Sequence, residues 1–174
     1  MKLRDATITD ISSIAKIQVD GWKNTYRGII SDAFLDAMSY KLQEKFLENN
    51  FLPLLNTKNT FCFVAEEDAG IVVGFAVGGL ERTNHPHFKG ELYGIYILKE
   101  YQRKGLGRVL VQMVVRKLLE MNLQSMLVWV LAKNPFKLFY EKLGGTEISE
   151  RQIEIAGTLL DEVAYGWHDI KVII

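Results

Sequence analysis

A short string of basic and glycine residues at positions 102–108 has the composition of an anion-binding loop. In order it consists of Gln102, Arg103, Lys104, Gly105, Leu106, Gly107 and Arg108. The two glycines let a ligand approach the backbone N–H groups closely, and the three cationic side chains add positive charge at the same place. The string therefore predicts a site for a phosphate-containing ligand, in particular a pyrophosphate.

An expected strand and an expected helix hold this string in place. Residues 91–98 are rich in aromatic and β-branched side chains, which predicts a buried strand. From Leu106 onward apolar residues recur every four positions with polar residues between them, as is typical of an amphipathic helix. The string thus opens a helix, where the first N–H groups are free and the helix dipole is positive. Both properties favour an anion.

Two other phosphate-binding motifs do not fit. A dinucleotide-binding loop needs a third glycine where this chain has Leu110, and an acidic residue about 20 positions further on. Residues 122–133 contain no acidic residue. A Walker loop needs a Gly-Lys-Ser/Thr string, which does not occur in the chain.

A second stretch has equally clear signals. Residues 126–131 form an apolar run that predicts a strand, and a short helix is expected at 136–143. Asn134 suits the N-cap of that helix, Pro135 suits its first position, and Gly144 suits the position just past its end.

Together these two stretches resemble the two conserved blocks of the GCN5-related N-acetyltransferase (GNAT) superfamily. The spacing Gln-x-x-Gly-x-Gly at 102–107 resembles its acyl-CoA pyrophosphate loop, and the strand, Asn134 and the string at 139–144 resemble its second block. The order of expected elements is similar to this superfamily over essentially the whole chain. The resemblance implies an α/β (α+β) fold, with a mixed, mostly antiparallel central sheet of about seven strands and about four flanking helices. The sheet would open like a V between residues 91–98 and 126–131.

The resemblance also implies acetyl-CoA as cosubstrate. Its pyrophosphate would lie on the loop at 102–108, and its pantetheine arm would pair with the backbone around Ile95, Tyr96 and Ile97 like an added strand. Asn134, Phe139 and Tyr140 would line the cofactor from the other side of the opening. Gly94, in the middle of the expected strand, fits a bulge that would splay the sheet.

Transfer of an acetyl group from a thioester to an amine needs a base for the amine and an acid for the leaving thiolate. A tyrosine can supply the second proton, and the resemblance places Tyr140 where the superfamily commonly carries its general acid. A purely structural role remains open, since Phe136, Phe139, Tyr140 and Leu143 have the spacing of one packed helix face. The base is left between Glu91, at the start of the central strand, and Glu81, at the end of the previous one, acting directly or through water.

The acceptor side is less well marked. Trp22 and Tyr26 lie in residues 21–30, which we expect to be irregular, and this segment resembles a recurring version of the superfamily's variable acceptor side. We expect these two aromatics and the loop at 81–90 to border the acceptor pocket. The acceptor is predicted to be the primary amine of a small molecule, attacked directly in a ternary complex. Protein N-terminal or lysine acetylation is an alternative, as is an inactive acyl-CoA-binding sensor or interaction module.

Composition sets wider limits. The 174 residues are 48% hydrophobic with no net formal charge, which predicts one domain over 1–174 and argues against nucleic-acid and membrane partners. Cys62 is expected to be a small buried hydrophobe, and His85 and His87 lack further Cys or His ligands, so no metal is expected. The N-terminal residues lack an apolar signal core, so we expect a cytoplasmic protein. The apolar end at 171–174 needs cover from the sheet or from a second subunit in a homodimer.

The remaining elements follow from periodicity and turn signals. Strands are expected at 1–6, 60–66, 71–80, 146–155 and 159–170, and helices from residue 9 and over 31–50, the latter ended by Pro53 and residues 56–59.

Overall fold

The computed structural model describes residues 1–55, 57 and 59–174, so the expected helix end at 56–59 lies partly outside the described residues. The strands are β1 (Lys2–Asp5), β2 (Thr60–Glu66), β3 (Val72–Leu80), β4 (Gly90–Ile97), β5 (Met126–Leu131), β6 (Thr146–Ile155) and β7 (Thr158–Trp167). The α-helices are α1 (Ile11–Thr25), α2 (Asp32–Ala37), α3 (Tyr40–Asn50), α4 (Leu106–Glu120) and α5 (Leu138–Lys142). Short 3₁₀ helices occur at Ile8–Asp10, Leu52–Leu54, Lys99–Tyr101 and Ile170–Ile173.

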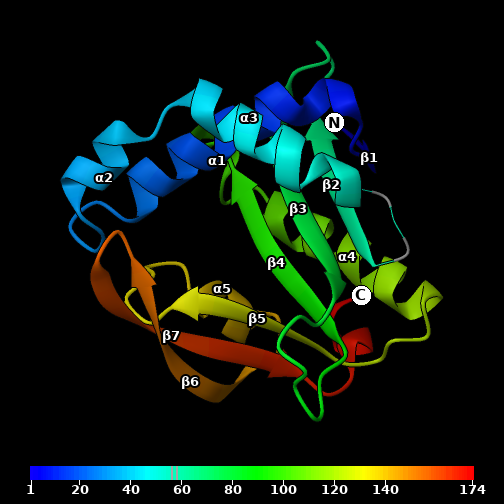
Figure 1. The fold of residues 1–174 in the computed structure, drawn as a ribbon. Coiled ribbons are helices and arrows are strands. Elements are labelled where there is room, and N and C mark those ends of the chain that lie inside the picture. The colour runs from blue at the N-terminus through cyan, green and yellow to red at the C-terminus, as the bar shows by residue number, and fades with distance from the viewer. Residues whose placement is uncertain (56, 58) are drawn as a thin grey trace.

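All seven strands belong to one sheet in the order β1-β2-β3-β4-β5-β7-β6. Neighbouring strands are antiparallel except β4 and β5, which are parallel and pair only at Gly90↔Met126 and Glu91↔Leu127. Beyond these two pairs β4 and β5 diverge, and Figure 1 shows the resulting V between them. The expected mixed, splayed sheet is confirmed.

A β-bulge lies in β4 next to the glycine that suggested one. Val77 of β3 pairs with Gly94, but Gly78 pairs with Leu92, so Tyr93 is an extra residue in β4. A bulge bends its strand and increases the local twist. It sits just past the last pairs with β5, where the two strands begin to separate.

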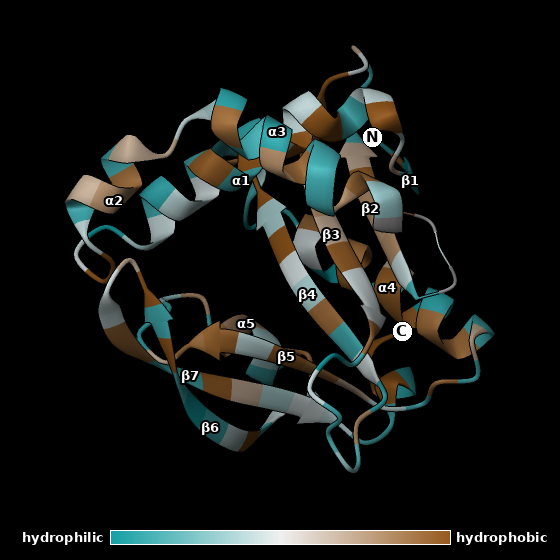
Figure 2. Ribbon diagram, viewed as in Figure 1, coloured by the Kyte–Doolittle hydropathy of each residue, from teal (hydrophilic) through white to brown (hydrophobic). Residues whose placement is uncertain are grey.

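The helices cover the sheet on both faces (Figure 1). α4 packs its apolar side, including Leu110, Val114 and Leu118, onto one face in a cluster with residues of β2, β4, β5 and β7. α1 and α3 pack onto the other face of the β2–β3 part of the sheet, in a cluster that includes the fully buried Cys62. Figure 2 shows β5 mostly brown, whereas β6, at the sheet edge, is largely teal.

The expectation of one helix over 31–50 was wrong, because the chain turns between α2 and α3. Met38 has the extended ψ of 124°, and the Oγ of Ser39 accepts a hydrogen bond from Leu42 N at 3.2 Å. Ser39 is therefore an N-cap that starts a new helix. Leu42 and Phe46 of α3 are 65% and 56% exposed, although their spacing is that of a buried helix face.

The expectation of an irregular segment at 21–30 was wrong for its first half, since α1 continues to Thr25, and was confirmed for residues 26–30. The glycine is explained by a close contact instead of a break. A Cβ at Gly21 would lie 2.8 Å from Cδ1 of the Tyr96 ring, so this face of α1 packs directly on β4.

The C-terminal residues are covered by their own chain. Ile170 and Ile173 are buried in the cluster under α4, and Gln112 Nε2 donates to Ile173 O at 2.9 Å. The strand expected to reach residue 170 ends at Trp167. A homodimer thus is not needed to cover these two side chains and stays a prediction. No helix among the described residues has both the length and the hydropathy to cross a membrane.

Candidate active site

The edge of β4 that faces the V carries backbone groups that, beyond Glu91, pair with no strand of the described residues. Leu98 N donates to Val73 O at 2.9 Å, and polar groups of a strand alternate in direction, so those of Tyr96 point to β3. The N–H and C=O groups of Ile95 and Ile97 therefore point into the V. Of the three residues expected to pair with a ligand, the structure gives this orientation to Ile95 and Ile97. The prediction was wrong for Tyr96, whose backbone pairs with β3 and whose side chain packs against α1.

The basic, glycine-containing loop at 102–108 lies between β4 and α4 as expected. Gln102 Nε2 donates to Ile97 O at 2.9 Å, which ties the loop to the end of the strand. Arg103 has a φ of 58° and Gly105, the N-cap of α4, has a φ of 83°. The left-handed φ favours glycine at position 105, whereas packing does not require it, because a Cβ there would meet no atom within 4 Å. The first N–H groups of α4, at 106–108, have no acceptor within the helix.

The second glycine of the loop is explained by packing. A Cβ at Gly107 would lie 3.2 Å from the Phe139 ring, so the glycine brings the start of α4 against α5. Arg103 and Lys104 are exposed at the loop. Arg108 is exposed too, but its Nη2 reaches Lys142 O at 3.4 Å, at the far end of α5.

The segment before α5 differs from the expectation in detail. Asn134 was expected to cap a helix beginning at once, but α5 begins at Leu138. Hydrogen bonds from Lys137 N to Asn134 O and from Tyr140 N to Lys137 O span three residues, so the segment between Asn134 and α5 forms tight turns. Asn134 is buried, and its side chain accepts from Phe136 N at 2.8 Å while it donates to the Tyr26 hydroxyl at 3.2 Å.

Tyr140 combines a packed ring with a free hydroxyl. Its residue is only 7% exposed, and its ring contacts those of Phe139 and Tyr165 at centroid distances of 5.3 and 5.9 Å. The Tyr140 hydroxyl has no hydrogen-bond partner among the described residues. It is not fully buried, so it reaches the surface of the candidate site. Burial is the main cause that raises the pKa of Tyr140 above its ordinary value, and the nearby Tyr96 phenol raises it further.

Trp22, Tyr26 and Tyr96 gather around the same opening. Trp22 Nε1 donates to the Tyr96 hydroxyl at 2.9 Å, and the Trp22 and Tyr26 rings meet edge to face at 5.3 Å. Burial raises the pKa of Tyr26, and the phenols of Tyr96 and Tyr140 raise it further. The structure thus brings the expected acceptor-side aromatics next to Asn134 and Tyr140.

The two candidate bases have different surroundings. Glu91 is 1% exposed at the closed end of the V, and it is held by Arg82, with Nη2 2.5 Å from Oε1 and both Nε and the backbone N 3.1 Å from Oε2. Glu81 lies outside β3, where its carboxylate accepts bonds from Thr83 and from His85 N. Partial burial raises the pKa of Glu81, but these hydrogen bonds outweigh it and lower the pKa overall.

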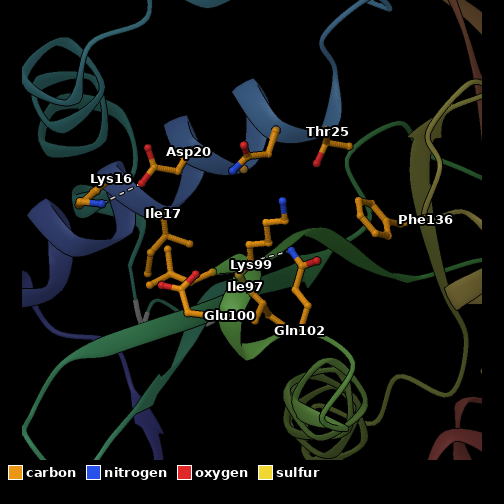
Figure 3. Close-up of a pocket in the computed structure, with 12 residues that line it drawn as sticks. Lys16, Ile17, Asp20, Thr25, Ile97, Lys99, Glu100, Gln102 and Phe136 are labelled. Atoms are coloured by element: carbon orange, nitrogen blue, oxygen red, sulfur yellow. Dashed lines mark hydrogen bonds and ion pairs between the residues drawn. The ribbon is translucent and has the colours of Figure 1, made fainter.

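A pocket of about 260 Å³ lies at the C-terminal end of β4. Figure 3 shows α1 on one side of it, with Lys16 and Asp20 joined by an ion pair, and the segment from Ile97 to Gln102 on the other. Phe136, before α5, closes a third side. The pocket therefore opens directly beside the loop at 102–108.

Sequence reasoning did not single out Arg82 or the pair Arg151 and Glu162. It also did not assign Trp129 to the acceptor side. Arg151 Nε donates to Glu162 Oε2 at 2.9 Å, and its guanidinium carbon lies 3.9 Å from the Trp129 ring centroid. The alternation of β6 and β7 could have placed Arg151 and Glu162 on one face. Their pairing also depends on register, which the sequence does not show.

The chain belongs to the GNAT family of acetyltransferases, because the family model described as "Acetyltransferase (GNAT) family" matches residues 22–144. It is an N-acetyltransferase by this membership. A curated relative, the "Uncharacterized N-acetyltransferase YuaI" of Bacillus subtilis (strain 168), is 38% identical over 171 residues, covering 98% of this chain and 95% of that protein.

Solved structures share the fold. The ribosomal-protein-alanine N-acetyltransferase from Brucella melitensis superposes with a TM-score of 0.70 at 22% identity, covering 96% of this chain and 99% of that one. The putative acetyltransferase yncA from Salmonella typhimurium, solved with its cofactor acetyl-CoA, gives 0.70 at 22% identity, covering 98% and 94%. The family and fold expected from the sequence are confirmed.

Proposed function

We propose that this N-acetyltransferase transfers the acetyl group of acetyl-CoA to the primary amine of a small molecule, by direct attack in a ternary complex. The observation that carries the proposal is the free edge of β4 with the unbonded Tyr140 hydroxyl across the V from it. The Salmonella protein of the same fold is described with acetyl-CoA as its cofactor, which supports the same cosubstrate here.

The site has the groups that acetyl-CoA needs. The N–H groups at the start of α4 and the exposed Arg103 and Lys104 suit its pyrophosphate. The backbone groups of Ile95 and Ile97 that point into the V suit the amides of its pantetheine arm, like an added strand. Phe139, packed against Gly107, borders the same opening.

The reaction requires two proton transfers. The amine nitrogen attacks the thioester carbon, a C–N bond forms and the C–S bond breaks, and the amine loses a proton while the sulfur gains one. Tyr140 donates the proton to the sulfur, since its raised pKa keeps the phenol neutral at physiological pH. The Ile97 N–H points towards the V and can stabilise the charge on the carbonyl oxygen.

Glu91 is the base in this proposal, acting through water because Arg82 covers its carboxylate. It lies at the closed end of the V, on the strand that flanks the cofactor. Glu81 is the weaker candidate, since its carboxylate is occupied by the loop that follows it and its pKa is lowered.

The cofactor half of the proposal is tested by titration calorimetry with acetyl-CoA. Gly105→Glu places a carboxylate at the expected pyrophosphate site and should weaken binding by about 100-fold or more. Gly70→Glu is the matched control, because Gly70 also has a positive φ, 80°, and open space around its Cβ position, but it lies in the turn between β2 and β3. Equal affinity in both variants would remove the loop from the site.

The transfer half is tested by CoA release with a panel of amines. A folded protein that binds acetyl-CoA but releases no CoA with any amine would instead be an inactive acyl-CoA-binding sensor or interaction module, the non-enzymatic alternative.

A further inference from the structure

A group of side chains beside the transfer site has no role in the mechanism above. It consists of Trp129 on β5, Glu162 on β7 and Arg151 on β6. Residues paired in register point to the same face of a sheet, and the pairs Leu131↔Glu162 and Arg151↔Glu162 link these strands. Trp129 is two residues before Leu131 and therefore shares that face.

This face is the one that carries Glu91 and the α1–α2 region. Glu91 pairs with Leu127, two residues before Trp129 on β5. Leu131 packs in a cluster with Ile30 and Leu35 of the α1–α2 region, and Trp22 and Tyr26 pack against the same cluster. This face of the sheet therefore extends along β5 from the neighbouring Glu91, at the closed end of the V, to the neighbouring Glu162 at the other end, with Trp129 between them.

The indole N–H of Trp129 has no acceptor. It is the one side-chain nitrogen or oxygen among the described residues that is fully buried without a hydrogen-bond partner. A buried donor without an acceptor is costly, and such groups in folded proteins call for an explanation such as a ligand.

Arg151 is held beside this donor. Its Nε and Nη2 both contact Glu162 Oε2, at 2.9 and 2.8 Å, and its guanidinium stacks on the Trp129 ring. The Arg151 side chain is 37% exposed and that of Glu162 only 12%. Nη1 has no partner among the residues that the structure describes. The group therefore keeps unused N–H donors at Nη1, while its carboxylate is largely buried.

The group is close to the transfer centre. Tyr26 packs against the cluster that contains Leu131, the residue paired with Glu162, and its hydroxyl accepts from Asn134 Nδ2 at 3.2 Å. Burial and then Tyr96 raise the pKa of Tyr26 most, and Tyr140 and Glu162 raise it further.

We propose that Arg151 and Trp129 form a subsite for a carboxylate on the acceptor, so that the acceptor is an amino carboxylate and not a polyamine or an aminoglycoside. This proposal rests on the proposed function. A guanidinium and an indole N–H are both donors, and a planar carboxylate has two oxygens that can accept from them together. A polycationic acceptor would meet the guanidinium with like charge.

The experiment compares matched acceptors. L-α-amino acids and ω-amino acids from 3-aminopropanoate to 6-aminohexanoate are each assayed against their primary amides, with spermidine and kanamycin as cationic acceptors. CoA release at saturating acetyl-CoA gives kcat/KM. At least one amino carboxylate should exceed its amide by tenfold or more. Turnover of spermidine, kanamycin or the amides without a preference for carboxylates would overturn this proposal and leave the proposed function standing.

Trp129→Phe tests the donor, because it keeps a ring under Arg151 and removes the N–H. The preference for carboxylate over amide should fall several-fold, with acetyl-CoA affinity unchanged. An unchanged preference would overturn the assignment of Trp129.

Arg151 is tested in Arg151→Met/Glu162→Gln, which avoids leaving Glu162 unpaired. The carboxylate preference should fall about 10- to 100-fold, as for loss of a charged hydrogen bond. Arg116→Met is the matched control, since Arg116 is exposed on α4. Glu162→Gln alone should keep the preference; if it abolishes turnover instead, Glu162 binds a cationic acceptor and the proposal is wrong. Failure of the proposed function would show separately, as absence of acetyl-CoA binding or of CoA release with every amine.

Discussion

Replacing Tyr140 by phenylalanine should separate catalysis from packing. The variant keeps the ring contacts with Phe139 and Tyr165 and loses only a hydroxyl that has no hydrogen-bond partner among the described residues. The free energy of unfolding should therefore change by less than about 0.5 kcal/mol, the usual range for substitutions that break no specific interaction. The proton for the leaving thiolate, however, is lost.

The expected loss in kcat is about 10²- to 10⁴-fold, the range for a general acid step, which corresponds to roughly 3–5 kcal/mol of transition-state stabilisation. Tyr140→Leu is the packing control. It loses both aromatic pairs, each worth about 0.5–1.5 kcal/mol, and should be less stable by about 1–3 kcal/mol while losing kcat to a similar extent.

The pH dependence follows from the raised pKa of Tyr140. An unperturbed phenol titrates near 10, so the phenol in the folded protein stays protonated throughout pH 6–9. The loss in kcat should thus be the same at every pH in that range. Because the folded-state pKa is the higher one, its contribution to stability is complete below about pH 10 and falls only above it. CoA release and thermal melting on one preparation measure both quantities. A kcat within about threefold of wild type across pH 6–9 would refute the role of Tyr140.

Two further predictions concern stability. Asp10 is buried and accepts bonds from both terminal nitrogens of Arg4, which lower its pKa, so Asp10→Asn should cost about 2 kcal/mol, or roughly 4–8 °C in Tm. Since the folded-state pKa is the lower one, this contribution is present above about pH 4 and is lost as the pH falls further; a pH-independent difference between the two proteins from pH 2 to 7 would contradict it. Ser39→Ala should remove the cap of α3 and cost about 1 kcal/mol in denaturant unfolding, whereas Ser31→Ala, at a helix start without a side-chain cap bond, should cost less.

Local patterns were enough to predict the backbone elements around the proposed cofactor site. The loop at 102–108, the apolar strands on either side of the V and the glycine beside the bulge each lie within a few residues of what they determine. The errors arose where tertiary contacts override local preference. Gly21 suggested a break, but it lets α1 pack on the Tyr96 ring. Asn134 suggested a helix cap, but its side chain also binds Tyr26, 108 residues away, and tight turns separate it from α5.

The acceptor half could not be predicted in the same way, for a physical reason. The proposed cofactor site uses mainly backbone groups, which a strand edge and a helix start supply whatever the neighbouring side chains are. The proposed acceptor site uses side chains from α1, β5, β6 and β7, and their meeting depends on strand register. A shift of one residue between β6 and β7 would turn Arg151 to the opposite face and separate it from both Glu162 and Trp129. If both proposals hold, substrate preference can change through the outer hairpin while the cofactor site stays intact, and the proposed carboxylate subsite is the place where such a change would act in this chain.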